Sequence, residues 1–270
     1  MSDTPAGADD GGDRNEPGDQ LINDGVKTIN GGTGPFARTE ILLGAEAMRR
    51  LRETSVMVCG IGGVGSYAAE ALARAGIGRI IIIDRDVVEE SNINRQVHAT
   101  YATVGLPKTA AMRERILDIN PECIVEAKQM IIDGSNAAAL IGSAGKLDYI
   151  IDAVDDVAAK VALVTEAVRL KIPIISSMGA ANRVFPDMFE ITDIYQTSVC
   201  PLAKAMRREL KKTGVPSLTC VYSKEPPRKT GGGALGSVSF VPPAAGLLLA
   251  GHVIRAAAGV NMPKNIRANI

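Results

Sequence analysis

A run of glycines early in the chain has the spacing of a phosphate-binding turn. Residues 60–65 read Gly-Ile-Gly-Gly-Val-Gly and follow a short apolar run. Glycines let the backbone turn tightly and approach a phosphate, and the N–H groups that open the next helix point at the anion. Asp84 follows Gly65 by 19 positions, where an acidic side chain commonly binds ribose hydroxyls. The pattern predicts a nucleotide that contains ribose, and it fits NAD as well as ATP. The motif glycines are Gly60, Gly62, Gly63 and Gly65.

A group of polar side chains after Asp84 favours ATP. These residues lie in a long connection beyond the predicted strand, where ligands bind in parallel sheets. Their many hydrogen-bond donors suit a triphosphate better than nicotinamide. Each one could instead belong to a solvated loop. The group comprises Asp86, Ser91, Asn92, Asn94, Arg95 and Gln96, with Lys108 at the start of the next predicted helix.

Two acidic residues, Asp155 and Asp156, follow a later apolar run. A carboxylate at this position can hold Mg²⁺, which prefers oxygen ligands. Either residue could instead cap the helix that follows. We expect Asp155 to be the magnesium ligand.

Short apolar runs alternate with helical stretches through the middle of the chain. Short, β-branched runs between helices indicate a parallel sheet covered on both faces. The prediction is a Rossmann-like, doubly wound α/β domain with a mainly parallel sheet and a C-terminal extension. The predicted strands are 56–59, 80–83, 124–127, 149–153 and 172–176, and the predicted helices are 66–75, 109–120, 136–142 and 157–170.

The two ends of the chain differ from this pattern. Residues 1–34 have almost no large apolar side chains and are predicted to be a disordered tail, which leaves a single domain over 35–270. A helix capped by Thr39 and ending at Arg52 should open that domain, with Ile41, Leu42 and Met48 on one face. The C-terminal extension is predicted as a helix over 201–212, a strand over 217–222, a mobile loop over 224–236 and a helix over 243–258.

Composition narrows the cellular setting. Lys plus Arg and Asp plus Glu both number 30, so no strong overall positive charge points to DNA, and any nucleic-acid site must be local. The four cysteines form no C-x-x-C pair, which argues against a zinc ribbon or a disulfide scaffold. The start of the chain lacks the features of a signal peptide, and the apolar run over 241–254 is too short to span a bilayer. We expect a cytoplasmic protein without a membrane partner.

Several motifs together resemble the adenylating superfamily of ubiquitin-activating enzymes and the bacterial activators of thiamin and molybdopterin biosynthesis. The motifs are GIGGVG, IDRDVVEESNINRQ, GLPKTAAM and DAVDD, and the resemblance covers about residues 36–258. It implies that Gly63, Asp84, the segment 91–95, Lys108 and the two acids at 155 and 156 contact ATP, with Mg²⁺ near Asp155. It also implies that Arg38 reaches the active site of a second subunit, and therefore a homodimer.

The C-terminal part indicates a branch of this superfamily. Activators of carrier proteins usually have two zinc-binding C-x-x-C pairs, which this chain lacks. The segments 196–203, 217–222 and 236–243 instead resemble tRNA threonylcarbamoyladenosine dehydratases. That resemblance implies adenylation of the threonylcarbamoyl carboxylate on an adenosine beside the anticodon, followed by cyclisation with net loss of water. Arg38, Arg95, Lys108 and Asp155 would be catalytic, and a sulfur-transfer protein is a candidate partner.

A basic run in the predicted helix over 201–212 is a candidate tRNA-binding face. Its five cations stand against one acid, Glu209, which suits contacts with phosphates. A solvated helix face is the alternative, and no aromatic side chains interleave to stack on bases. The five cations are Lys204, Arg207, Arg208, Lys211 and Lys212.

Other functions stay open at this point. A ubiquitin-like sulfur carrier could be the group that is adenylated, and Cys200 or Cys220 could be a nucleophile. A dinucleotide-dependent oxidoreductase would explain the glycines and Asp84 but would give the segment 91–96 no role. A nucleotide sensor without turnover is a non-enzymatic alternative.

Overall fold

The computed structural model describes residues 33–231 and 235–260. Contacts divide the chain into Met1–Thr33 and Gly34–Ile270, and every helix and strand below belongs to the second unit. The predicted disordered tail over 1–34 lies outside the described residues except for its last two positions.

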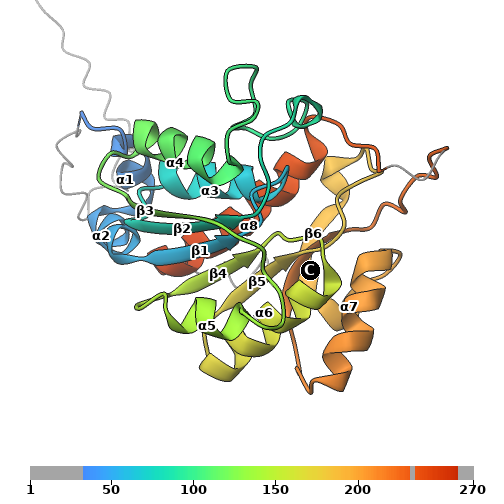
Figure 1. The fold of residues 1–270 in the computed structure, drawn as a ribbon. Coiled ribbons are helices and arrows are strands. Elements are labelled where there is room, and N and C mark those ends of the chain that lie inside the picture. The colour runs from blue at the N-terminus through green and yellow to red at the C-terminus, as the bar shows by residue number, and fades with distance from the viewer. Residues whose placement is uncertain (1–32, 232–234, 261–270) are drawn as a thin grey trace, which may run out of the picture. The chain divides into compact units, whose positions relative to one another are not determined.

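The described residues form a seven-stranded sheet in the order β3-β2-β1-β4-β5-β7-β6 (Figure 1). All neighbours pair in parallel except β6, which runs antiparallel to β7 at one edge. The predicted doubly wound α/β fold with a mainly parallel sheet is confirmed. The strands are β1 (Ser55–Cys59), β2 (Arg79–Asp84), β3 (Ile124–Gln129), β4 (Tyr149–Asp152), β5 (Ile174–Ser177), β6 (Phe189–Asp193) and β7 (Thr219–Ser223).

Helices cover both faces of the sheet, as α3 and α4 on one side and α5 and α6 on the other show in Figure 1. The isoleucines of β2 alternate between the two cores: Ile80 and Ile82 pack with the first group of helices, and Ile81 and Ile83 with the second. The first group is α1 (Ala37–Leu43), α2 (Ala45–Glu53), α3 (Gly65–Arg74), α4 (Lys108–Ile119) and α8 (Val241–Ala258), and the second is α5 (Ala137–Gly142) and α6 (Val157–Leu170). Helix α7 (Pro201–Lys212) packs beside α6, and its buried residues belong to a third core cluster. Three short 3-10 helices complete the elements: η1 (Glu90–Asn92), η2 (Pro186–Met188) and η3 (Ile194–Gln196).

The predicted helix from Thr39 to Arg52 is wrong, because it is two helices. Gly44 breaks it at φ 87° and ψ 159°, a conformation that only glycine adopts readily. Phe36, not Thr39, holds the N-cap position of α1. The predicted apolar face is divided as well, since Leu42 is 82% exposed while Met48 is buried.

The edge strand β6 was not predicted. All five of its residues are partly exposed, and its sequence Phe-Glu-Ile-Thr-Asp lacks the apolar run that marks the central strands. An antiparallel edge strand of this kind depends on its partner β7 more than on local pattern.

Helix α8 is a helix of the protein core. Its 18 residues are long and apolar enough, by length and composition alone, to cross a membrane, but half of them are buried within the fold. It packs on α2 and α3. A Cβ on Gly246 would lie 2.2 Å from the carbonyl oxygen of Val64, so α8 approaches the start of α3 backbone to backbone.

The glycine turn gives a test of this packing. A Cβ on Gly65 would lie 1.8 Å from the carbonyl oxygen of Gly60, whereas one on Gly62 would meet nothing within 4 Å. Gly65→Ala should therefore lower the free energy of unfolding by on the order of 3 kcal/mol, because backbone must move to admit the methyl group. Gly62→Ala is the matched control and should stay within about 0.5 kcal/mol of wild type in urea unfolding. Equal stability of the two variants would contradict the tight turn.

Candidate active site

The residues predicted to bind the nucleotide follow the carboxyl ends of neighbouring strands. Strand β1 lies between β2 and β4, and all three run in the same direction. Their carboxyl ends therefore bring together the glycine turn after β1, Asp84 at the end of β2, and the segment after β4. Ligands bind at this edge in open α/β sheets.

The glycine turn is fixed by close backbone contacts. Gly60 has φ 85°, and a Cβ there would lie 2.7 Å from the carbonyl oxygen of Ala153. Gly63 stands close to Arg95, whose Cγ would be 3.3 Å from a Cβ at this position. Space remains open at Gly62, and α3 has no side-chain cap at its start. The turn thus has room for a phosphate and unshielded N–H groups to meet it.

Asp84 organises the turn as well as facing the site. Its carboxylate accepts hydrogen bonds from the backbone N–H of Ile61 at 2.6 Å and of Asp86 at 2.9 Å. A carboxylate has about four acceptor positions, so two remain for ribose hydroxyls. The structure therefore supports a double role for this side chain.

Lys108 and Asp86 form an ion pair beside Asp84. The Nζ of Lys108 lies 2.8 Å from the Oδ2 of Asp86, and the lysine side chain is only 8% exposed. This hydrogen bond lowers the pKa of Asp86 below its usual value. The pair holds a buried positive charge at the end of β2, where a phosphate could share it.

Arg95 is held by its own loop. Its guanidinium donates to the carbonyl oxygen of Ser91 at 2.7 Å and to the Oδ1 of Asn94 at 2.8 Å. Asn94 in turn donates to the carbonyl oxygen of Ser237 at 3.1 Å. The predicted phosphate-binding group is thus preordered, and it is connected to the segment before α8.

Asn92 and Gln96 are less available to a ligand than expected. Both are about 5% exposed. The Oδ1 of Asn92 accepts from the backbone N–H of Glu89 at 3.2 Å, so this side chain shapes the loop. The Oε1 of Gln96 is buried and has no hydrogen-bond partner among the described residues.

The two acids after β4 have different roles. Asp156 caps α6, since its Oδ1 accepts from the backbone N–H of Ala159 at 2.8 Å. Asp155 is exposed and has no such role. No group of three or more His, Cys, Asp or Glu side chains lies close enough to hold a metal within the described ranges. A single carboxylate still fits Mg²⁺, which usually takes one or two carboxylates together with phosphate oxygens and water.

A buried ion pair beneath this edge was missed by the sequence reasoning. The Nζ of Lys160 lies 2.9 Å from the Oδ2 of Asp152, and both side chains are 0% exposed. Lys160 also donates to the carbonyl oxygen of Val154, and Ser176 donates to Asp152. The sequence did contain one indication of it, since a lysine within the mostly apolar helix 157–170 needs a buried partner for its charge. The pair fixes the backbone on which Ala153 and Asp155 stand.

The basic helix α7 presents fewer free cations than predicted. Arg207 is turned inward and donates to the carbonyl oxygen of Thr197 at 3.0 Å and to its hydroxyl. Arg208 and Lys212 both pair with Glu209, and Lys211 lies 5.9 Å from the centre of the Tyr195 ring. Lys204, Arg208, Lys211 and Lys212 remain exposed. The positive face is therefore real but partly neutralised, and Arg207 does not belong to it.

The four cysteines are buried. Burial raises the pKa of Cys220 to about 12 and that of Cys123 to about 11. Cys200 is 2% exposed at the start of α7. Since the thiolate is the reactive form, the raised pKa values argue against Cys123 and Cys220 as nucleophiles, and burial argues against Cys200 because a substrate could not reach its sulfur.

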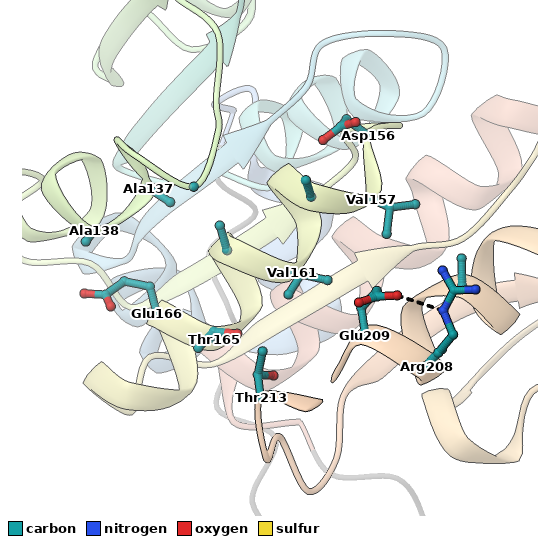
Figure 2. A pocket seen from close by; sticks show the side chains of 14 residues that line it. Ala137, Ala138, Asp156, Val157, Val161, Thr165, Glu166, Arg208, Glu209 and Thr213 are labelled. Atoms are coloured by element: carbon teal, nitrogen blue, oxygen red, sulfur yellow. Dashed lines mark hydrogen bonds and ion pairs between the residues drawn. The ribbon is translucent and has the colours of Figure 1, made fainter. Parts of the chain in front are cut away.

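A cavity of about 780 Å³ lies among α5, α6 and α7 (Figure 2). Figure 2 shows Asp156 at one end and the Arg208–Glu209 pair at its α7 side, with small apolar side chains such as Val161 between them. The residues that line the cavity include none of the glycines of the turn over 60–65, nor Asp84, Arg95 or Lys108. The cavity is therefore separate from the predicted nucleotide site at the glycine turn.

Arg38 lies far from the glycine turn of its own chain. The ring of Phe36 lies 3.6 Å from where a Cβ on Gly76 would stand, and Gly76 follows the end of α3. The glycine turn precedes the other end of this 10-residue helix, about 15 Å away. Arg38 is exposed on α1 beside Ile41 and Leu42, which are 55% and 82% exposed.

Comparison with known proteins agrees with this geometry. The model of the ThiF family matches residues 36–269. The tRNA threonylcarbamoyladenosine dehydratase of Bacillus subtilis is 42% identical over 237 residues, which cover 81% of this chain and 92% of that protein. The crystal structure of the Escherichia coli tRNA N6-threonylcarbamoyladenosine dehydratase in complex with ATP has a TM-score of 0.78 and 36% identity, and the match covers 86% of this chain and 96% of that one. The AMP complex of the same enzyme matches equally well, at 35% identity.

His98 makes the stability of this region depend on pH. It is 3% exposed, neither ring nitrogen has a hydrogen-bond partner among the described residues, and burial lowers its pKa to about 4, with help from Lys108 and Arg115. The unfolded chain takes up this proton near pH 6.5 and the folded chain only near 4, so stability is lost as pH falls through that window. The loss should be on the order of 3 kcal/mol at about 1.4 kcal/mol per pKa unit. His98→Asn should remove this part of the pH dependence in urea unfolding between pH 7 and 4, while His252 remains in both proteins. If the free energy of unfolding depends on pH in the same way in His98→Asn and in wild type, His98 is not the source of this pH dependence.

Proposed function

This chain belongs to the ThiF family, and on that basis we propose that it catalyses the ATP-dependent dehydration of threonylcarbamoyladenosine in tRNA. The observation that carries the proposal is the 42% identity to a dehydratase across 92% of that enzyme's length. The site adds the chemistry, since a glycine turn, a ribose-binding acid and two fixed cations meet at one edge of the sheet.

The reaction needs activation of a poor electrophile. An oxygen of the substrate carboxylate attacks the α-phosphorus of ATP, and the bond to the β-phosphate breaks to release pyrophosphate. The ureido group of the same substrate then attacks the activated carbonyl carbon, loses a proton and expels AMP. Because the ureido group is tethered to the carbonyl, ring closure needs little beyond positioning. No nucleophile from the protein is required, in keeping with four buried cysteines.

The side chains divide the work. The glycine turn and the start of α3 receive the phosphates, and Asp84 receives the ribose. Arg95 and Lys108 offset the negative charge that develops as pyrophosphate leaves. Asp155 would hold Mg²⁺, which would supply further charge neutralisation on the phosphate oxygens. The exposed cations of α7 would contact tRNA phosphates, and the described residues from position 35 onward would form one domain. A cytoplasmic location and a sulfur-transfer partner belong to the same proposal.

The second candidate is adenylation of a ubiquitin-like sulfur carrier. It would use the same ATP site but a protein tail in place of tRNA. The absence of any C-x-x-C pair from the sequence is the feature that counts against it.

Pyrophosphate release separates the two candidates. Wild type should release pyrophosphate from ATP only when tRNA bearing threonylcarbamoyladenosine is added, and unmodified tRNA is the control. Lys108→Ala should lower this rate by about 10²-fold or more, because one charge-stabilising donor is lost. If pyrophosphate release requires a carrier-protein tail and does not change when modified tRNA is added, the second candidate is correct and the dehydratase is not.

We also propose that the enzyme is a homodimer in which Arg38 acts on the partner's ATP. Ile41 and Leu42 beside Arg38 are exposed apolar side chains, which supports a surface that a second subunit covers. The position of Arg38 near the far end of α3 supports action in trans, since the segment is remote from its own glycine turn. A two-fold dimer would complete both sites in the same way.

Complementation tests action in trans. Arg38→Ala and Lys108→Ala proteins should each be nearly inactive alone. In a mixed dimer one site then carries both defects and the other carries neither, so equal mixing with full exchange should restore about a quarter of wild-type activity. With action in cis every site keeps one defect, and mixing restores nothing although subunit exchange is confirmed by mass spectrometry.

A further inference from the structure

Three segments meet at a junction formed by Asn182, beyond the ends of β5 and β7. The backbone N–H of Asn182 donates to the carbonyl oxygen of Gly236 at 2.8 Å, and Gly236 donates back to the Asn182 side chain at 2.6 Å. The backbone N–H of Arg228 donates to the carbonyl oxygen of Asn182, also at 2.8 Å. Asn182 has φ 58°, a left-handed conformation that asparagine tolerates better than most residues. The junction ties together the segments 178–188, 224–231 and 235–240.

This junction lies at the same edge of the sheet as the ATP-binding residues. Strands β5 and β7 run parallel to β4 and β1, so their carboxyl ends open onto that edge. The hydrogen bond from Asn94 to the carbonyl oxygen of Ser237 connects the Arg95 loop to the segment next to Gly236. A substrate whose carboxylate is adenylated near the glycine turn must therefore pass or rest against these segments.

Phe185 is presented here in a fixed position. Its ring is 48% exposed. Its backbone N–H donates to the carboxylate of Glu225 at 3.0 Å, and the N–H of Val184 donates to the same group. Glu225 is 5% exposed, so the clamp on the Phe185 backbone is a buried one. The backbone of Phe185 is thus fixed by the fold, and its apolar side chain is exposed to water.

A planar cation stands beside the ring. The guanidinium carbon of Arg228 lies 5.8 Å from the centre of the Phe185 ring, and the Arg228 side chain is 58% exposed. The Nε of Arg228 also lies 3.7 Å from the Oε1 of Glu225, which positions the guanidinium. Lys224 and Lys229 are exposed nearby, and Lys224 pairs with Glu190. Aromatic rings and guanidinium planes are the groups on which proteins stack unpaired nucleobases.

We propose that Phe185 and Arg228 form a stacking pair for an unpaired nucleobase of the tRNA loop that carries the modified adenosine. The inference rests on the proposed function and deepens it, since it names what holds the RNA beside the active site. The threonylcarbamoyl group of the modified adenosine can enter the active site only if a neighbouring base in the loop unstacks. The stacking pair would replace the stacking contacts that this base loses.

The test uses a synthetic anticodon stem-loop that carries threonylcarbamoyladenosine. Phe185→Ala should weaken its binding about tenfold, as expected for loss of one base–aromatic stack, whereas Phe185→Tyr should bind like wild type. Arg228→Ala should weaken binding more than Arg228→Lys, since lysine keeps the charge but not the plane. The effect should appear in KM more than in kcat, with ATP affinity unchanged. Ile124→Ala is the matched control, because Ile124 is 61% exposed at the start of β3, the edge strand on the far side of the sheet from β6 and β7.

Abasic RNA identifies the stacked base. One abasic substitution next to the modified adenosine should weaken wild-type binding about tenfold and leave Phe185→Ala binding no worse than it already is. If Phe185→Ala binds the RNA as tightly as wild type, and every abasic RNA affects the two proteins alike, the stacking pair is wrong. The proposed dehydratase function is unaffected by that result. A wild-type protein that shows the stacking effects but releases no pyrophosphate with this RNA would overturn the proposed function and leave the stacking pair in place.

Discussion

The close backbone approach at the end of β1 is the constraint on which the site depends. Gly60 packs against the carbonyl of Ala153, and Gly65 packs against the carbonyl of Gly60. No side chain fits at either position, so the turn, the start of α3 and the end of β4 share one rigid arrangement. On the outer side of α3, Gly246 of α8 brings a further backbone against Val64. The N–H groups proposed to bind phosphate are therefore positioned by packing before any ligand arrives, as preorganised electrostatic stabilisation requires.

The buried pair of Asp152 and Lys160 supports the same arrangement from within the fold. Both charges are removed from water, so each depends on the other and on the hydrogen bonds from Ser176 and to Val154. Breaking such a pair by removing one partner costs about 3–5 kcal/mol, because the remaining charge is left uncompensated. The pair thereby fixes the turn that carries Asp155, although neither member is exposed.

Hydrogen bonds connect the proposed nucleotide site with the segments proposed to contact RNA. Hydrogen bonds run from Arg95 to Asn94, from Asn94 to the backbone of Ser237, and from neighbouring Gly236 to Asn182. The loop of Arg95 therefore shares its support with the segments proposed to hold RNA. In the proposed complex, the adenylated carboxylate and the rest of the substrate would rest on one connected structure.

Local pattern in the sequence was sufficient for the alternating strands and helices, the glycine turn and the acid at Asp84, because periodicity and glycine spacing act over a few neighbouring residues. Pattern could not show that Gly44 divides a helix, that Asp156 caps α6 or that Arg207 turns inward to Thr197, since each depends on backbone conformation or on a partner around it. Pairings between distant residues, such as the clamp of Glu225 on Phe185, arise only when strand ends meet in space. The sequence by itself thus determined the fold class and the nucleotide chemistry, and the tertiary structure decided which polar side chains are free for a ligand, because hydrogen bonding to the fold uses up the others.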